Sequence, residues 1–166
     1  MTEYWESIKD IPAEQIAYVD ETGIDNYLYR EYGWSQRGKP LIGRISGRKY
    51  KRTGIVAAQM GKAILAPLQY DGTMNSALFE TWFELCLLPN LPQNSVIVMD
   101  NASFHRKRKL FLLIENTGHK LIFLSPYFPE LNPIENFWSW LKRYLRKILP
   151  LHSSFDDALY SAFQVC

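Results

Sequence analysis

The sequence lacks several features that identify common classes of protein. It contains only two cysteines, Cys86 and Cys166, which cannot build a disulfide framework and suit a reducing cytosol. Its longest unbroken apolar run, Ala63–Leu68, is far shorter than the roughly 18 residues of a membrane-spanning helix. The segment Met1–Asp10 has neither the basic start nor the apolar stretch of a secretory signal. We therefore expect a cytoplasmic protein that does not associate with membranes.

The composition that is present is typical of one globular domain. Apolar residues make up 47% of the 166 residues and charged residues 22%, a balance that argues against disorder. A chain of this length can bury roughly two-thirds of the surface of its unfolded state, so it can form a core without disulfides. We divide it into a lead-in, residues 1–13, and a single domain, residues 14–166.

Basic residues gather in three clusters, although the net charge is only +2. Residues 32–70 hold eight Lys and Arg and no acidic residue, and 106–109 and 142–147 hold four basic residues each. One such cluster can be a solvated surface, but three together favour a polyanion such as nucleic acid. A lone histidine, His105, is better explained by a structural or DNA-facing role than by metal ligation. The residues assigned to DNA are Lys39, Arg44, Arg48, Lys49, Lys51, Arg52, His105, Arg143 and Arg146.

The pattern of apolar residues predicts an α/β fold. Five short runs indicate strands, at 15–19, 53–59, 62–69, 95–99 and 120–124. Apolar residues at helical spacing indicate helices at 75–88, at 103–116, from Pro133 to Pro150, and from Ser154. We favour Ser103 as the N-cap of the second helix. The order of elements suggests a mixed sheet flanked by helices, antiparallel in its first three strands and parallel afterwards.

Two aspartates directly follow strand-like runs, and they are the first candidates for a site. Asp20 follows a run that ends at Val19, and Asp100 follows one that ends at Met99. If these strands are parallel neighbours, both carboxylates reach one point at the carboxyl edge of the sheet. Two adjacent carboxylates repel each other, and a hard cation such as Mg²⁺ removes that cost. For either aspartate alone, a turn or cap role is the alternative. The neighbouring Glu21 points to the opposite face if the strand continues through it.

A third carboxylate, Glu135, has two possible roles. With Asn132 as N-cap and Pro133 at the first helical position, Glu135 occupies the third position of a capping box. A glutamate in the first turn of a helix that proline positions can equally project toward the two aspartates. The spacing alone does not decide between these roles.

Three segments resemble the catalytic blocks of mariner-type DDE transposases, in particular those of bacterial insertion sequences. They are Tyr18–Gly23, Val98–His105 and Ser125–Glu135. Asp100 and Glu135 have 34 residues between them, which is similar to the spacing in that branch. Trp34 followed by Gly38-Lys39-Pro40 also resembles the family pattern. The match covers roughly residues 14–150, and three blocks in order are far more specific than any one.

The resemblance implies an RNase H-like fold with the strands of Asp20 and Asp100 side by side, and it favours the functional role of Glu135. It also implies that these three carboxylates hold two Mg²⁺ or Mn²⁺ ions, with Asp20 bridging both. The reaction implied is DNA cleavage and strand transfer at transposon ends, with joining to a TA-containing target. The family further suggests a homodimer on DNA, in a bacterial cytoplasm and associated with the nucleoid.

One departure from the family concerns recognition of the transposon ends. No segment has the pattern of the N-terminal helix-turn-helix module that family members carry, so we expect a separate subunit or an upstream reading-frame product to supply it. Two alternatives to a transposase stay open at this point. One is a metal-dependent nuclease of the same fold that does not join DNA, and the other is a non-catalytic remnant that binds DNA or a partner.

Overall fold

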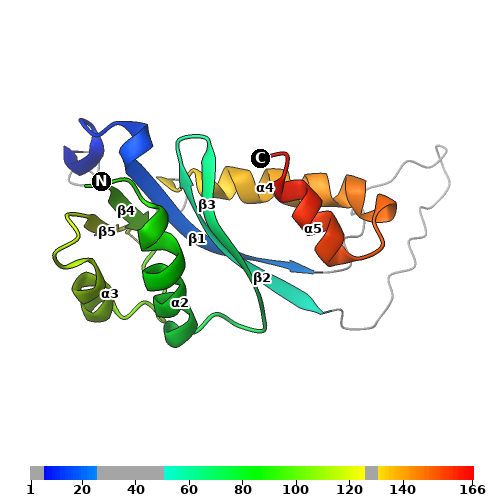
Figure 1. Cartoon of the computed structure of the whole chain (residues 1–166), viewed down its shortest axis with the longest axis horizontal. Coiled ribbons are helices and arrows are strands. Elements are labelled where there is room, and N and C mark those ends of the chain that lie inside the picture. Colours follow the sequence, from blue (N-terminus) through cyan, green and yellow to red (C-terminus); the bar gives the residue numbers. More distant parts are fainter. Residues whose placement is uncertain (1–5, 26–50, 126–130) are drawn as a thin grey trace, which may run out of the picture.

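A five-stranded sheet forms the centre of the computed structural model, which describes residues 6–25, 51–125 and 131–166 (Figure 1). The strands are β1 (Ile16–Asp25), β2 (Arg52–Met60), β3 (Ala63–Asp71), β4 (Val96–Met99) and β5 (Lys120–Phe123). Their order in the sheet is β3-β2-β1-β4-β5. β1 to β3 pair antiparallel, whereas β1 pairs with β4, and β4 with β5, in parallel. The predicted mixed sheet is confirmed.

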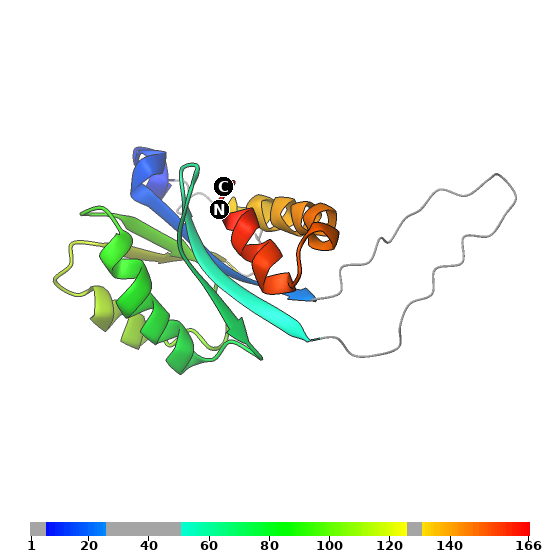
Figure 2. The ribbon, with the colours of Figure 1, turned by 45° about the vertical axis from the view of Figure 1, so that its right-hand side comes forward.

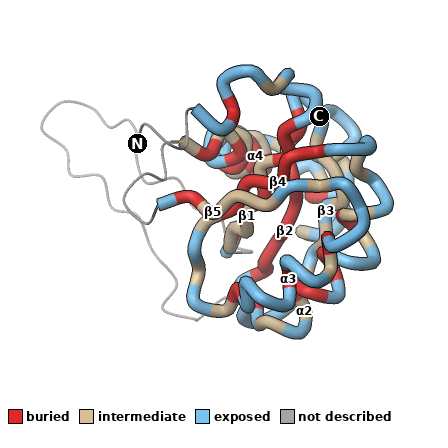
Figure 3. The backbone as a smooth tube through the Cα atoms, turned by 90° about the vertical axis from the view of Figure 1, so that its left-hand side faces the viewer, coloured by how far each residue is buried: buried red, intermediate tan, exposed pale blue. Residues whose placement is uncertain are grey.

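Alternation along β1 separates the core into two layers. Ala17 and Val19 pack into an apolar cluster with α2 (Ser76–Trp82) and α3 (Lys107–Ile114). Ile24, on the other face of the strand, packs with α4 (Ile134–Ile148) and α5 (Phe155–Phe163). The sheet therefore lies between two pairs of helices, as Figures 1 and 2 show. Figure 3 shows the buried positions of β2 and β4 at the centre of the molecule.

The boundaries of two helices differ from the sequence-based expectation. The helix expected from Ser103 begins only at Lys107, because a turn precedes it in which the His105 amide donates to the Ala102 carbonyl at 3.0 Å. Ser103 is therefore not an N-cap. α2 ends at Trp82, where the chain continues as a π-helical turn, Phe83–Leu87.

Other local features support the same architecture. The turn between β2 and β3 contains Gly61, whose φ of +59° favours glycine. Ser154 caps α5 by accepting a hydrogen bond from the Asp157 amide at 3.1 Å. Cys86 packs, partly buried, against the cluster beneath α2. Within the described ranges, no helix combines the length and apolar character that crossing a bilayer requires.

Candidate active site

Asp20 and Asp100 lie next to each other at one edge of the sheet. Val19 of β1 is in register with Met99 of the parallel strand β4, and each aspartate is the next residue along its chain. Neighbouring strands are about 4.8 Å apart. The two strand ends therefore bring these carboxyl groups, 80 positions apart in the sequence, to the same edge. The side-by-side arrangement predicted for these strands is confirmed.

Asp20 points toward α4 and is held there by a tryptophan. Val19 belongs to the cluster beneath α2, so the next side chain along β1 faces the opposite layer. The indole Nε1 of Trp138 donates a hydrogen bond to Asp20 Oδ2 at 3.1 Å, and Trp138 itself is only 1% exposed. The core of the α4 layer thus fixes the direction of this carboxylate.

Asp100 is more open to solvent and is oriented by the turn that follows it. Its side chain is 50% exposed. Oδ1 accepts from the Ala102 amide at 3.3 Å and lies 3.3 Å from Nδ1 of His105. The same ring nitrogen lies 3.2 Å from the Asp100 carbonyl. A backbone amide and a buried imidazole therefore hold this aspartate.

His105 does not lie where a DNA contact would need it. Its side chain is 1% exposed and packs between Phe79 and Phe104, with ring centroids 4.4 Å from each. Burial lowers the pKa of His105, against the opposing charge of Asp100. A ring covered in this way supports Asp100 from behind, so the DNA-facing role we assigned to His105 does not fit, whereas the structural role does.

Glu135 stands exposed in the first turn of α4, and the start of that helix is tied to β1. Asn132 Nδ2 donates to the Val19 carbonyl at 3.3 Å, which crosses 113 positions of sequence. Capping of the helix by Asn132 was one of the two alternatives that the sequence left open, but no side chain caps α4, and Pro133 occupies the cap position. The capping interpretation is wrong because the Asn132 side chain is turned to β1 instead.

The carboxyl group of Asp20 responds to the charges of the other two. Burial, then the charge of Glu135 and, less strongly, the charge of Asp100 together raise the pKa of Asp20 from 3.8 to about 7. Hydrogen bonds from the Glu21 backbone and Trp138 act in the opposite direction. A buried carboxyl group next to two others suits a hard divalent cation, which offsets both the desolvation and the repulsion. Among the described residues, no group of three His, Cys, Asp or Glu side chains is already spaced as a set of metal ligands.

A comparison with known families agrees with this geometry. The sequence pattern of the DDE superfamily endonucleases matches residues 15–157 of the chain. The chain belongs to this family. The DDE family assignment that the three segments predicted is confirmed.

Solved structures of transposases and integrases share the fold of this DDE domain. The Mos1 strand transfer complex aligns with a TM-score of 0.67 at 16% identity, over 98% of this chain and 56% of that chain. The mariner Mos1 paired-end complex with Mg gives a TM-score of 0.65 at 15% identity, over 98% and 56%. A simian T-cell lymphotropic virus intasome gives 0.56 at 16% identity, over 90% and 47%. The predicted RNase H-like fold is confirmed.

A bacterial relative is closer in sequence. Protein y4pE/y4sA of Sinorhizobium fredii is 33% identical over 89 residues, which is 54% of this chain and 62% of that protein. The DDE domain thus spans about half of the solved relatives and less than two-thirds of this bacterial one.

The basic residues assigned to DNA fall into two groups. Arg143 and Arg146 are exposed on α4, where they line a groove of about 510 Å³ together with Trp140, Tyr144 and Lys147. The Trp140 and Tyr144 rings stack there, with centroids 5.2 Å apart.

At the start of β2, Lys51 is exposed and pairs with Asp71 at 2.9 Å, and the next residue, Arg52, is exposed as well. The remaining DNA assignments, Lys39, Arg44, Arg48 and Lys49, lie outside the described residues.

Glu21 lies in buried surroundings that the sequence did not reveal. It faces the α2 side of β1, as expected for a strand that continues to Asp25. Burial, followed by the charges of Asp20 and Asp100, raises the pKa of Glu21 from 4.5 to about 8. Its Oε2 is buried and accepts no hydrogen bond from any described residue. Keeping a buried carboxylate ionised without a hydrogen-bond donor costs free energy. The signal in the sequence was the pair of strand glycines Gly23 and Gly54, over which the side chains of Arg52 and Tyr70 lie.

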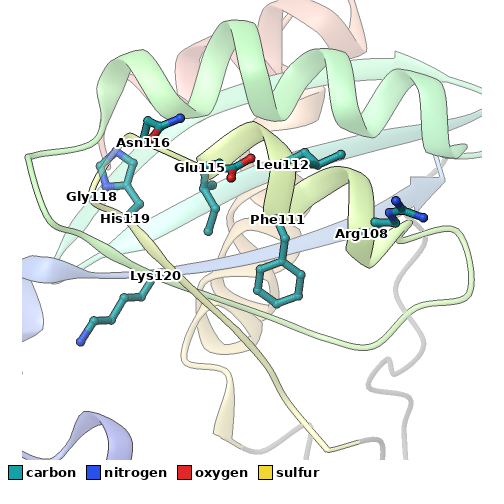
Figure 4. Close-up of a pocket in the computed structure, with 9 residues that line it drawn as sticks. Arg108, Phe111, Leu112, Glu115, Asn116, Gly118, His119 and Lys120 are labelled. Atoms are coloured by element: carbon teal, nitrogen blue, oxygen red, sulfur yellow. The ribbon is translucent and has the colours of Figure 1, made fainter.

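A larger cavity, of about 1010 Å³, takes no part in this site. It lies between the end of α3 and the start of β5, and none of the three carboxylates lines it. Figure 4 shows the lining residues Phe111 and Leu112 of α3, together with His119, which precedes β5, and Lys120, its first residue.

Two residues of α2 hold the turn that follows Asp100. Arg106 makes two hydrogen bonds of 2.6 Å each to the carboxylate of Glu80, which is only 7% exposed. Ser76 Oγ donates to the Phe104 carbonyl at 2.7 Å. The turn is thereby attached at two points to the helix beneath the sheet, which limits how far Asp100 can move.

Proposed function

We propose that this DDE domain cleaves DNA and joins the resulting 3′ end to a target in a reaction that depends on divalent metal ions. Asp20, Asp100 and Glu135 are the catalytic carboxylates. The observation that carries the proposal is the register of β1 and β4, which brings Asp20 and Asp100 to the same edge of the sheet, where burial and the charges of Glu135 and Asp100 raise the pKa of Asp20. Perturbed carboxyl groups that cluster at a strand edge are typical of functional sites.

The three carboxylates are hard oxygen donors of the kind that Mg²⁺ and Mn²⁺ prefer. Asp20, Asp100 and Glu135 would hold these ions, and Asp20 would be a ligand shared by two of them. Such ions supply Lewis-acid stabilisation of the attacking and leaving oxygens in an in-line displacement at phosphorus. The Mg and Mn complexes of mariner Mos1 support this choice of cofactor.

The protein's own contribution is to orient these groups before the substrate arrives. Trp138 fixes Asp20, and the Ala102 amide and His105 fix Asp100. Near pH 7 the raised pKa leaves Asp20 partly protonated, so binding of a cation releases a proton from this group. Preorganised carboxylates of this kind need no rearrangement of the backbone during the reaction.

DNA is the substrate, and the exposed basic residues hold its phosphate backbone. Arg143 and Arg146 on α4, with Lys51 and Arg52 at the start of β2, give binding that is largely independent of sequence and weakens with salt. Lys39, Arg44, Arg48 and Lys49 belong to the same assignment. Solved Mos1 structures of this fold, among them a paired-end complex with a transposon end, support DNA as the partner.

Further parts of the proposal follow the family. The substrates are transposon ends and a TA-containing target, and a homodimer assembles on the DNA. A helix-turn-helix subunit, or an upstream reading-frame product, recognises the ends. The domain, residues 14–166, acts in the bacterial cytoplasm at the nucleoid.

A joining assay tests the proposal and separates it from its rivals. The purified chain is incubated with Mg²⁺ or Mn²⁺, a labelled duplex with a free 3′-hydroxyl, and a supercoiled plasmid. We expect labelled plasmid, and its loss in the variants Asp20→Ala, Asp100→Ala and Glu135→Ala. Nicked plasmid without label identifies a nuclease that does not join DNA. Activity that survives all three substitutions refutes the assignment of the carboxylates.

A further inference from the structure

Asn132, which lies just before α4, is a buried polar residue with hydrogen bonds in two directions. Its side-chain Nδ2 donates to the Val19 carbonyl at 3.3 Å, and its own carbonyl accepts from the Glu135 amide at 3.2 Å. The residue is only 5% exposed. One residue therefore connects the backbone of β1, next to Asp20, with the backbone of Glu135.

The stability of the fold does not by itself explain an asparagine at this position. The Oδ1 atom of Asn132 is buried and accepts no hydrogen bond from any described residue. A buried amide oxygen without a donor costs at least as much free energy as one hydrogen bond of the same side chain contributes. The bond to Val19 thus adds little net stability, yet it joins two segments that each carry a carboxylate of the site.

A second bond holds the same helix against the next residue of β1. Trp138 Nε1 donates to Asp20 Oδ2 at 3.1 Å. Glu135 lies three residues after Asn132 and three before Trp138, and residues three apart on a helix are neighbours on its surface. The two bonds between α4 and β1 therefore flank Glu135 along the chain.

The carboxylate of Glu135 has no support of its own. The side chain is exposed, and no described residue donates a hydrogen bond to it. Its charge nevertheless raises the pKa of Asp20 more strongly than the charge of Asp100 does, so it lies within electrostatic reach of that group. The position of this carboxylate consequently depends on where the backbone of α4 begins.

We propose that Asn132 is the positioning residue for Glu135. Its bond to Val19 fixes the start of α4 against β1 and thereby sets the affinity for the metal ion that Glu135 holds. The inference rests on the proposed function, because it concerns the same carboxylates. Groups that orient metal ligands contribute roughly 10- to 100-fold to metal affinity. The ion at Asp100 does not depend on this bond, since Asp100 follows β4 and is held by its own turn.

Binding of Mn²⁺ to the folded chain, followed by electron paramagnetic resonance of the free ion, tests this inference. We expect the wild-type chain to bind two ions. Asn132→Leu keeps the approximate size of the side chain and removes both polar atoms, so one ion binds about tenfold more weakly and the other is unchanged. In a chain that already carries Glu135→Ala, Asn132→Leu has no further effect. Asn132→Ala gives the same pattern even if leucine does not fit the site.

A matched control separates positioning from stability. Ser154 also holds the start of a helix, since its hydroxyl accepts from the Asp157 amide at 3.1 Å. Ser154→Ala lowers the midpoint of urea unfolding in EDTA and keeps both ions. Unchanged binding of both ions in Asn132→Leu and Asn132→Ala, or an equal loss of affinity in Ser154→Ala, overturns the inference alone. A wild-type chain that binds no Mn²⁺ overturns the proposed function and this inference with it.

Discussion

Replacing Asp20 with asparagine is expected to stabilise the metal-free protein at alkaline pH. The folded state holds Asp20 among other carboxyl groups and raises its pKa from 3.8 to about 7. Between these values the unfolded chain has lost the proton that the folded chain keeps, so stability falls as pH rises. Asparagine has nearly the same shape, carries no charge, and still presents an oxygen to Trp138.

The magnitude follows from the two pKa values. A difference of one pKa unit corresponds to about 1.4 kcal/mol, so a pKa that moves from 3.8 to about 7 sets an upper limit of about 4 kcal/mol on the cost of ionised Asp20. We therefore expect Asp20→Asn to raise the free energy of unfolding at pH 8.5 by about 2–4 kcal/mol. At pH 4, where Asp20 is protonated in the folded state and about half protonated in the unfolded state, the variant and the wild type differ by less than about 1 kcal/mol.

Urea unfolding of both proteins in EDTA, followed by circular dichroism from pH 4 to pH 8.5, measures this difference. Asp25→Asn is the control, because Asp25 is exposed at the end of the same strand, and it changes stability by less than about 0.5 kcal/mol. A second series in Mg²⁺ stabilises the wild type by mass action and leaves Asp20→Asn unchanged. If Asp20→Asn has the wild-type stability at pH 8.5, the buried carboxyl cluster is not as we describe it.

Three further substitutions test the surroundings of the site. Trp138→Phe keeps an aromatic ring in the core but removes the hydrogen bond to Asp20, and it lowers the free energy of unfolding at pH 8.5 by about 1.5–3 kcal/mol, with a smaller loss at pH 4, as urea titrations measure. Glu80→Gln weakens the contact that holds the turn after Asp100. We expect it to lose a larger share of its rate of plasmid cleavage than of its free energy of unfolding, which urea titration measures. Arg143→Ala combined with Arg146→Ala weakens binding to random duplex DNA and reduces the slope of log K against log salt by about 2, which fluorescence anisotropy detects.

Much of the fold could be predicted because the apolar pattern changes with each element. The alternating and continuous apolar runs located all five strands, and the two runs that precede Asp20 and Asp100 belong to strands that pair in parallel. The helix boundaries were harder, since a turn stabilised by tertiary contacts replaces the first residues of the helix expected from Ser103. That turn depends on α2, through Ser76 and Glu80, and neither contact leaves a local signal in the sequence.

The candidate site shows the same division between local and distant effects. Asp20, Asp100 and Glu135 could be named because two follow strands and one begins a helix. Asn132 could not be interpreted correctly, because its side chain bonds to Val19, 113 positions away, rather than to its own helix. The burial of His105 and the buried surroundings of Glu21 likewise arise from packing between segments that the sequence does not bring together.

The most direct test of the carboxylate site is a crystal of the chain soaked in Mn²⁺ and measured near the manganese absorption edge. We predict anomalous peaks for two ions, one with Asp100 and one with Glu135 as ligand, and Asp20 in contact with both. Crystals of Asp20→Asn treated in the same way lose these peaks. Manganese bound elsewhere on the protein, with no density among the three carboxylates at saturating concentration, contradicts the account.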